Sequence, residues 1–280
     1  MLTNQFKINY SVGSIANGIK TDTFTFFLLF FYSNIIGLNP GLAGTAIFIA
    51  LCVDAFTDPL MGTISDRTNT SFGRRHPYMF ISFIPMSLGY IFLFAPRQDW
   101  DMSQSDLFVW MTIFTILTRI GMTLFDIPHR AFGGEITKNY NERTLLMSWR
   151  EMFAWVAGLS NAFLGYGVFF ASTPEFPQGQ LNPDAWFPFA LTGALIMIFS
   201  VLYSSLSTKN EINSLSKWSG SIALGAILNE LKIALGNKSF LIFFFGNLFL
   251  SLAWGLANAL TLFVNTYFWE FEATQIKYFL

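Results

Sequence analysis

The sequence predicts an all-α integral membrane protein, and three observations carry this prediction. The 280 residues are 53% hydrophobic and only 12% charged, whereas soluble domains carry about 25% charged residues. The apolar residues gather into runs that can cross a bilayer as helices, which takes about 20 residues each. The basic residues between these runs concentrate in every second connection, as expected for a multi-pass membrane protein.

Seven spans fit the apolar runs. They are expected over residues 8–35, 42–64, 77–96, 106–129, 144–172, 185–206 and 239–268. The turn GLNPGL ends the first span, and Pro77 opens the third, because proline is well tolerated in the first turn of a helix. The segment 173–184, which contains Pro and Gly, separates the fifth span from the sixth. A long polar segment precedes the seventh, and its stretch 222–235 has the pattern of an amphipathic helix on the membrane surface or under the bundle.

The charges of the connections predict the topology. Three connections hold three or four basic residues each, namely 65–76, 130–143 and 207–238. The alternate connections hold none apart from Arg97. Because basic loops stay on the cytoplasmic side, we expect the N-terminus and the three basic connections in the cytoplasm, with the chain in the inner (plasma) membrane of the cell.

Six spans, a long linker and one further span match the plan of a transporter with two six-helix halves. We expect an N-terminal six-helix half over 1–206, a central cytoplasmic linker over 207–238, and the first helix of a C-terminal half over 239–280. The chain is interpreted as a fragment, because it stops where an eighth span would begin. Spans 1–3 and 4–6 would then be inverted repeats, and a monomer is expected.

Several classes of protein do not fit the composition. No basic cluster interleaved with aromatic residues indicates nucleic-acid binding. Cys52 is the one cysteine, which rules out an intrachain disulfide and a multi-cysteine metal site. The first span is too long and too polar for a signal peptide. The expected partners are a small-molecule substrate and the lipid bilayer, with no cofactor and no metal beyond a coupling ion, Na⁺ or H⁺.

Two acids in the second span give the strongest functional signal. Asp54 and Asp58 are four residues apart and therefore share one face of a helix. Acids inside membrane spans are rare and usually functional. With a neighbouring hydroxyl such as that of Thr57 they can bind Na⁺, or one of them can hold a proton. Asp58 has a structural alternative, in which it anchors a helix end that bends at Pro59 and pairs with a loop arginine.

The fourth and fifth spans add further polar groups. Arg119, Thr123 and Asp126 fall on one face of the fourth helix. They fit a substrate or cation contact, or a buried ion pair between Asp126 and Arg150 of the fifth span. Arg150 suits a carboxylate or the vicinal hydroxyls of a sugar, and snorkelling to the cytoplasmic face is its alternative.

The first span contributes Asp22 as a candidate substrate contact. Lys20 lies two residues away and must face in another direction. Trp149 and Trp155 flank the charges of the fifth span and can stack on a sugar ring. Packing is the commoner use of an aromatic residue in a chain with 18% aromatic residues.

Two stretches together resemble the glycoside–pentoside–hexuronide:cation symporter family, the melibiose-carrier branch of the major facilitator superfamily. The first is DAFTDPLMG at 54–62 with SDRT at 65–68 and GRRHP at 73–77, and the second is DIP at 126–128 with EIT at 135–137 and NERT at 141–144. The resemblance runs from about residue 9 to residue 206, and more faintly into the last span.

The resemblance implies a major-facilitator-type fold and the uptake of a sugar or glycoside with Na⁺, H⁺ or Li⁺. It implies that Asp54, Asp58 and Thr123 serve the cation. It also implies that Asp126 and Arg150 lie on the substrate side of the cavity.

The same resemblance extends to a cytoplasmic gate and has two departures. Asp66, Arg74 and Arg75 resemble the gating motif of the superfamily, a charge cluster that stabilises one facing state. The sugar-binding acid of the family falls on Gly18, and its sugar-stacking aromatic residue falls on Arg130. An anionic substrate such as a hexuronide, or a lysophospholipid as in a related branch, is therefore an alternative to a galactoside.

We therefore predict a secondary active transporter, and not an enzyme, that performs cation-coupled symport of a sugar, glycoside or uronide by alternating access. The alternative within this class is a symporter of a lysophospholipid or another amphiphile. A Mg²⁺-dependent intramembrane prenyltransferase is the alternative from another class, because Asp54 and Asp58 resemble half of a diphosphate-binding motif. That chemistry needs a second acid cluster, which the fourth and sixth spans do not offer.

Overall fold

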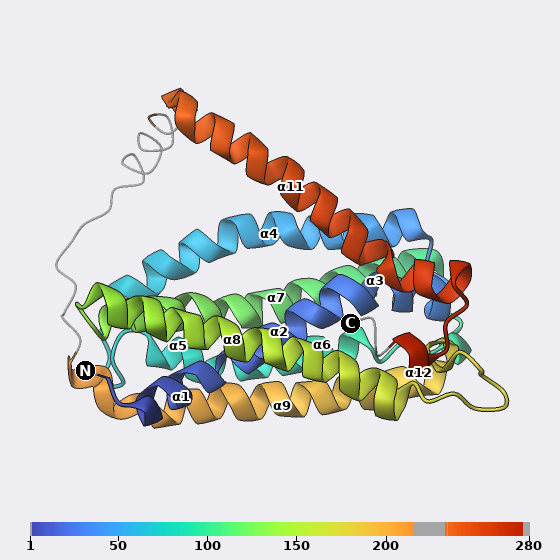
Figure 1. Ribbon diagram of the computed structural model, residues 1–280, viewed down its shortest axis with the longest axis horizontal. Helices are drawn as coiled ribbons and strands as arrows, with labels where there is room; N and C mark the ends of the chain where they lie inside the picture. Colours follow the sequence, from blue (N-terminus) through green and yellow to red (C-terminus); the bar gives the residue numbers. More distant parts are fainter. Residues whose placement is uncertain (1, 215–232, 234, 277–280) are drawn as a thin grey trace.

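The computed structural model describes residues 2–214, 233 and 235–276, and these residues form helices and connecting loops without a strand among them (Figure 1). Six helical stretches within the described part are long and apolar enough to cross a membrane. They comprise α4 (Pro40–Arg67), α5 with α6 (His76–Ile81 and Phe83–Leu93), α7 (Gln104–Glu135), α8 (Tyr140–Leu164), α9 (Trp186–Ser207) and α11 (Lys238–Phe263). The predicted all-α membrane class is confirmed.

The first predicted span is a helical segment with two wide turns. It contains α1 (Asn4–Val12), α2 (Ser14–Asp22) and α3 (Leu28–Phe30), with π-helical turns at Thr23–Phe27 and Phe31–Ile36. Such turns occur frequently at functional sites. The segment ends at Gly37, whose φ of 84° is the left-handed conformation that glycine adopts readily at a helix end.

The order of neighbours around the bundle is α4, α7, α6, α9, α2 and α8. This order is unchanged when spans 1–3 are exchanged with spans 4–6, since α4 packs on α7 as α8 packs on α2, and α6 packs on α9. An exchangeable pattern of this kind is typical of two related three-helix repeats.

Two helices are longer than the sequence predicts. α4 continues through Pro59 to Arg67 instead of ending at residue 64, and α7 continues through Pro128 to Glu135 instead of ending at residue 129. The expected loop 130–143 therefore shrinks to four residues, 136–139. The predicted end at residue 129 was wrong, because a membrane helix tolerates a proline such as Pro128 where neighbouring groups satisfy the freed backbone.

Local capping fixes where two of the spans begin. Asn39 accepts a hydrogen bond from the Gly41 amide at 2.8 Å, and Pro40 occupies the first turn of α4. Ser103 and Asp106 form a reciprocal capping box at the start of α7.

At two glycines the backbones of neighbouring helices come into direct contact. A Cβ atom at Gly18 of α2 would lie 2.0 Å from the carbonyl oxygen of Ala154 in α8. A Cβ atom at Gly121 of α7 would lie 2.3 Å from the Met86 amide nitrogen in α6. Small residues that let backbones approach are typical of helix packing in membranes.

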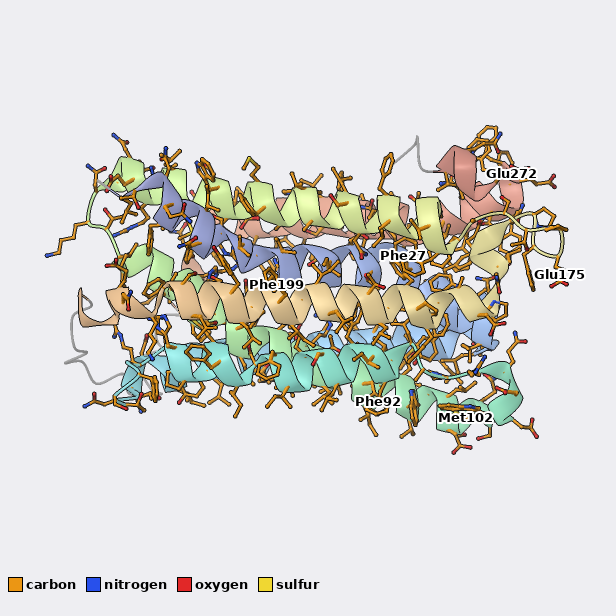
Figure 2. All side chains as sticks on the ribbon, turned by 90° about the horizontal axis from the view of Figure 1, so that it is seen from below. Phe27, Phe92, Met102, Glu175, Phe199 and Glu272 are labelled. Carbon is orange, nitrogen blue, oxygen red and sulfur yellow. The ribbon has the colours of Figure 1, made fainter. Side chains whose placement is uncertain are left out.

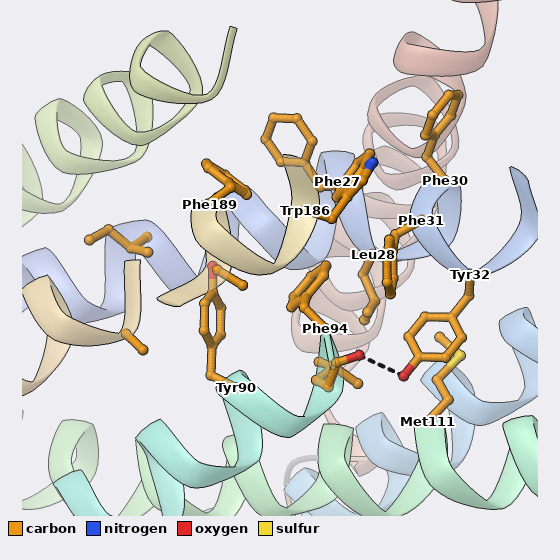
Figure 3. Close-up of a cluster of buried hydrophobic side chains, with 14 of the residues drawn as sticks. Phe27, Leu28, Phe30, Phe31, Tyr32, Tyr90, Phe94, Met111, Trp186 and Phe189 are labelled. Carbon is orange, nitrogen blue, oxygen red and sulfur yellow. Dashed lines mark hydrogen bonds between the residues drawn. The ribbon is translucent and has the colours of Figure 1, made fainter. Parts of the chain in front are cut away.

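An aromatic core closes the end of the bundle that lies away from the basic connections (Figure 3). Trp186 lies in its middle, with ring centroids 6.0 Å from Phe27 and 4.7 Å from Phe170. Tyr32 packs beside these rings, and its hydroxyl donates to the Leu93 carbonyl at 2.7 Å. Apolar side chains also cover the outside, as Phe199 (66% exposed) and Phe92 (42% exposed) show (Figure 2), which suits contact with lipid.

The seventh predicted span, α11, meets the bundle near its C-terminal end and diverges from it along the rest of its length (Figure 1). The Phe263 ring packs on Phe30 with centroids 5.2 Å apart. Beyond it, the Tyr267 hydroxyl donates to Asn34 at 2.8 Å, and the Gln180 amide donates to Thr266 at 3.2 Å. The amphipathic helix expected over 222–235 lies outside the described residues, apart from 233 and 235.

Candidate functional site

Helices α4 and α7 face each other with a two-rung ladder of polar side chains. Each helix contributes two residues one turn apart. On the first rung Arg119 of α7 forms an ion pair with Asp54 of α4. On the second rung the Thr123 hydroxyl donates a hydrogen bond to Asp58 at 2.7 Å. The structure thus brings together three of the four residues predicted for the cation, and it adds Arg119 to them.

Oxygen atoms remain free beside this ladder. The second carboxylate oxygen of Asp54 and the hydroxyl of Thr57 are buried and have no hydrogen-bond partner within the described part of the chain. Buried polar atoms are nearly always hydrogen-bonded, so these two oxygens are candidates for contact with a ligand. Oxygens of this kind are ligands that hard cations prefer.

Asp126 lies two turns after Arg119 in α7 and is held by two guanidinium groups. Arg150 of α8, only 2% exposed, forms an ion pair with one carboxylate oxygen. Arg130 contacts the other oxygen at 2.6 Å from one turn further along α7. Arg150 also donates to Glu151 at 2.8 Å. The ion pair between Asp126 and Arg150 joins α7 to α8, as the structural interpretation expects, and a role in substrate contact stays a prediction.

Asp22 takes part in a different network, between α2, α8 and α6. It accepts a hydrogen bond from the Asn161 amide of α8 at 3.3 Å. The same amide donates to the Thr23 hydroxyl at 3.3 Å, which lies 2.7 Å from the Tyr90 hydroxyl of α6. Asp22 is therefore the member of the Lys20–Asp22 pair that faces a neighbouring helix. Its role as a substrate contact stays a prediction.

Trp149 precedes Arg150 and stacks on Phe153 of the same helix, with centroids 6.3 Å apart. The stacking is a local contact along α8. Its predicted contact with a sugar ring stays a prediction.

The predicted gate residues meet at the end of the bundle that carries the basic connections. Arg75 contacts Asp66 at 3.0 Å and Glu135 at 2.5 Å, and Arg74 contacts Glu135 at 2.5 Å. Asp66 lies in the last turn of α4, and Glu135 is the last residue of α7. The ion pairs therefore connect these two helix ends to the start of α5.

Sequence reasoning assigned no role to Glu135 or to Asn161. Glu135 lies in the EIT stretch, but the predicted end of the fourth span at residue 129 placed it in a loop. Asn161 could have been found as a polar side chain in the middle of an apolar run of α8. Such side chains in membrane helices often hydrogen-bond to other helices.

The sequence model of a family described as MFS/sugar transport protein matches residues 9–280. An uncharacterized symporter of Synechocystis sp. is 31% identical over 211 residues, which is 73% of this chain and 37% of the relative. An isoprimeverose transporter of Lactiplantibacillus pentosus is 25% identical over 81% of this chain and 46% of its own length.

A third relative comes from an animal. A sodium-dependent lysophosphatidylcholine symporter of Danio rerio is 31% identical over 62% of this chain and 32% of its own length. The chain thus spans about a third to a half of the length of the relatives that it matches.

Proposed function

The chain belongs to the MFS/sugar transport protein family, and from this premise we propose that the protein is a secondary active transporter. It moves a sugar, glycoside or uronide together with Na⁺ or H⁺ by alternating access. The family consists of transporters, so the protein is not an enzyme. This assignment rejects the alternative of an intramembrane prenyltransferase.

The single observation that carries the proposal is the ladder between α4 and α7. Asp58 is held by a neutral hydroxyl and not by a basic group in the described residues, so its negative charge is available to a cation. The free oxygens of Asp54 and Thr57 lie on the same helix. Asp54, Thr57, Asp58 and Thr123 are therefore the proposed cation ligands, with Na⁺ coordinated by these oxygens or H⁺ carried on a carboxylate.

The substrate side is proposed to lie next to this ladder. Asp126 continues the same helix, and Arg150 forms an ion pair with it from α8, so a solute bound beside the ladder would meet both groups. Asp22 and Trp149 complete the proposed substrate residues. A solute that competes for Arg150 would loosen the link between α7 and α8, which offers a physical route from binding to a change of conformation.

Asp66, Arg74 and Arg75 are proposed as a gate, with Glu135 as a fourth member. Their ion pairs join the ends of α4 and α7 to the start of α5. Charge pairs that form in one facing state and break in the other shift the balance between the two states.

The setting follows the same proposal. The basic connections favour a cytoplasmic N-terminus, and a relative from Escherichia coli that is named an inner membrane symporter favours the inner (plasma) membrane. We propose a monomer whose division is a six-helix half over 1–206, a linker over 207–238 and the first helix of a second half over 239–280.

A lysophospholipid or another amphiphile is the second candidate substrate. The relative that is named for lysophosphatidylcholine symport favours it. The two candidate substrates need different binding sites. A sugar needs hydrogen-bond partners for its hydroxyl groups, whereas an acyl chain needs an apolar groove.

Transport by the full-length gene product in proteoliposomes tests this function. A Na⁺ gradient or a pH gradient is imposed, and labelled glycosides, uronides and lysophospholipids are screened for uptake. Gradient-driven accumulation of a sugar supports the first candidate and names the ion. Accumulation of a lipid alone moves the function to the second candidate, and no accumulation by folded protein rejects symport of these solutes.

A further inference from the structure

Three arginines of the described transmembrane helices form ion pairs with acids, whereas Lys20 forms none. The pairs are Asp54 with Arg119, Asp126 with Arg130, and Asp126 with Arg150. Lys20 of α2 takes part in no hydrogen bond and no ion pair with the described residues, which exclude 1, 215–232, 234 and 277–280. An ammonium group without a partner is costly inside a membrane and is by default a sign of function.

Lys20 lies next to the proposed transport site. Its Nζ atom is 6.0 Å from the centroid of the Phe24 ring, and the guanidinium carbon of Arg119 is 5.6 Å from the same centroid. Two cations thus flank one aromatic ring between α2 and α7, and Arg119 alone of the two has a carboxylate partner.

The helix face around Lys20 offers groups that bind hydroxyls. Asn17, Thr21 and Phe24 are at least partly exposed and recur at helical spacing with Lys20, whereas Gly18 and Ile19 behind them are buried. An amide, a hydroxyl and a ring beside an ammonium can hold a polyhydroxylated ring that carries one negative charge.

We propose that Lys20 binds the anionic group of the substrate, a carboxylate or a sulfonate, so that the transported solute is a hydroxylated anion and not a neutral glycoside. This inference rests on the proposed function as a symporter and names the substrate class of that site. The anion supplies the partner that Lys20 lacks, and the paired Arg119 stays on Asp54.

Binding to the purified full-length gene product tests the proposal with three solutes that share one ring. D-Glucuronate, 6-deoxy-6-sulfoglucose and D-glucose differ only in the substituent on C5, which is a carboxylate, a sulfonatomethyl or a hydroxymethyl group. We expect at least one anion to bind about tenfold or more tightly than glucose, the factor that one charge-assisted hydrogen bond supports. The carboxylate and sulfonate arms show which anion the site takes.

Three variants separate the charge of Lys20 from its packing. Lys20→Gln is expected to reduce anion affinity to that of glucose and to leave glucose affinity unchanged. Lys20→Arg keeps a charge and is expected to retain anion binding within about threefold. Lys138→Gln removes an exposed lysine from the 136–139 loop and is expected to change nothing. Thermal unfolding confirms that each variant is folded.

Several results would overturn the proposal. These are equal binding of glucose and both anions, an equal loss for all three solutes in Lys20→Gln, and no binding of either anion by folded wild-type protein. The symport proposal fails separately, when an anion binds through Lys20 but neither gradient drives its accumulation. Accumulation of glucose that Lys20→Gln leaves intact would preserve symport and reject the anion site.

Discussion

At the scale of single residues, the ion pair between Arg119 and Asp54 changes what the second span can offer to a cation. One carboxylate oxygen of Asp54 is occupied by a guanidinium, while Asp58 accepts a hydrogen bond from a neutral threonine. The two acids look equivalent in the sequence, because they share a face of one helix. Their partners on α7 make Asp58 the stronger site for a positive charge.

A double-mutant cycle measures this ion pair. We expect Arg119→Gln and Asp54→Asn each to lower the free energy of unfolding, and the double variant to lose less than the sum, with a coupling energy of about 0.5–3 kcal/mol. The side chains are 13% and 20% exposed, so solvent screens the pair only in part. Unfolding of the purified protein in detergent gives the four values.

Arg97 and Asp184 provide the matched control for that cycle. These two side chains are 2.8 Å apart and are 61% and 78% exposed. Exposed ion pairs contribute roughly 0–1 kcal/mol to the free energy of unfolding. A coupling energy no larger for Arg119 with Asp54 than for this pair would show that the first rung is not a structural link.

The hydroxyl of Thr123 is expected to tune cation binding through Asp58. Thr123→Val removes the donor and keeps the shape of the side chain, so the cation concentration at half-maximal stimulation of uptake should rise by roughly 3- to 10-fold. Thr123→Ser keeps the hydroxyl and should restore the wild-type value. Thr112→Val is the control on the same helix, since its hydroxyl donates to the Phe108 carbonyl. Equal effects at Thr112 and Thr123 would argue against a role at the cation site.

At the scale of helices, the glycines decide how closely the first span approaches the fifth. Gly18→Ala would place a methyl group against the carbonyl of Ala154, so α2 and α8 must move apart. We expect a loss of about 1–3 kcal/mol in stability, as for other overpacked contacts. Gly44→Ala is the control, because its Cβ would meet nothing within 4 Å. Measured by thermal unfolding, equal stability of the two variants would reject this close contact.

The charge cluster at the ends of α4 and α7 is expected to hold the connection before α5 in place. Glu135→Gln removes the acid that Arg74 and Arg75 share, so amide hydrogen exchange in the 68–75 connection should quicken several-fold. Glu175→Gln lies in the loop between α8 and α9 and should leave that exchange unchanged. Unchanged exchange in both variants would mean that Glu135 does not hold the gate.

Most helices could be predicted from the sequence, because hydropathy and loop charge report directly on membrane spans. Two ends could not. Pro128 signals a stop in a soluble helix, but α7 passes through it, and only this extension places Glu135 beside Arg75. The sequence also did not predict which neighbouring helix each polar side chain faces. Lys20 and Asp22 face different helices, which depends on how α2 packs against α7 and α8.

At the scale of the whole molecule, α11 meets the first span at one end and diverges from the bundle along the rest of its length (Figure 1). Composition predicted that it crosses the membrane, but not where it packs. The π-helical turn that follows α11 (Val264–Phe268) is held by single groups such as Thr266 and Tyr267, whose partners lie far away in the sequence. For the candidate site, the motif residues could be identified in the sequence, but which of them form hydrogen bonds and ion pairs with one another could not be predicted.

The central claim is that Asp58 couples a cation to solute movement. The most direct measurement compares gradient-driven accumulation with solute exchange at equal concentrations in proteoliposomes, for the full-length wild-type protein, Asp58→Asn and the exposed control Asp99→Asn. The account predicts that wild type and Asp99→Asn accumulate solute under a Na⁺ or pH gradient, while Asp58→Asn exchanges solute but does not accumulate it. Accumulation by Asp58→Asn at the wild-type level would contradict the account.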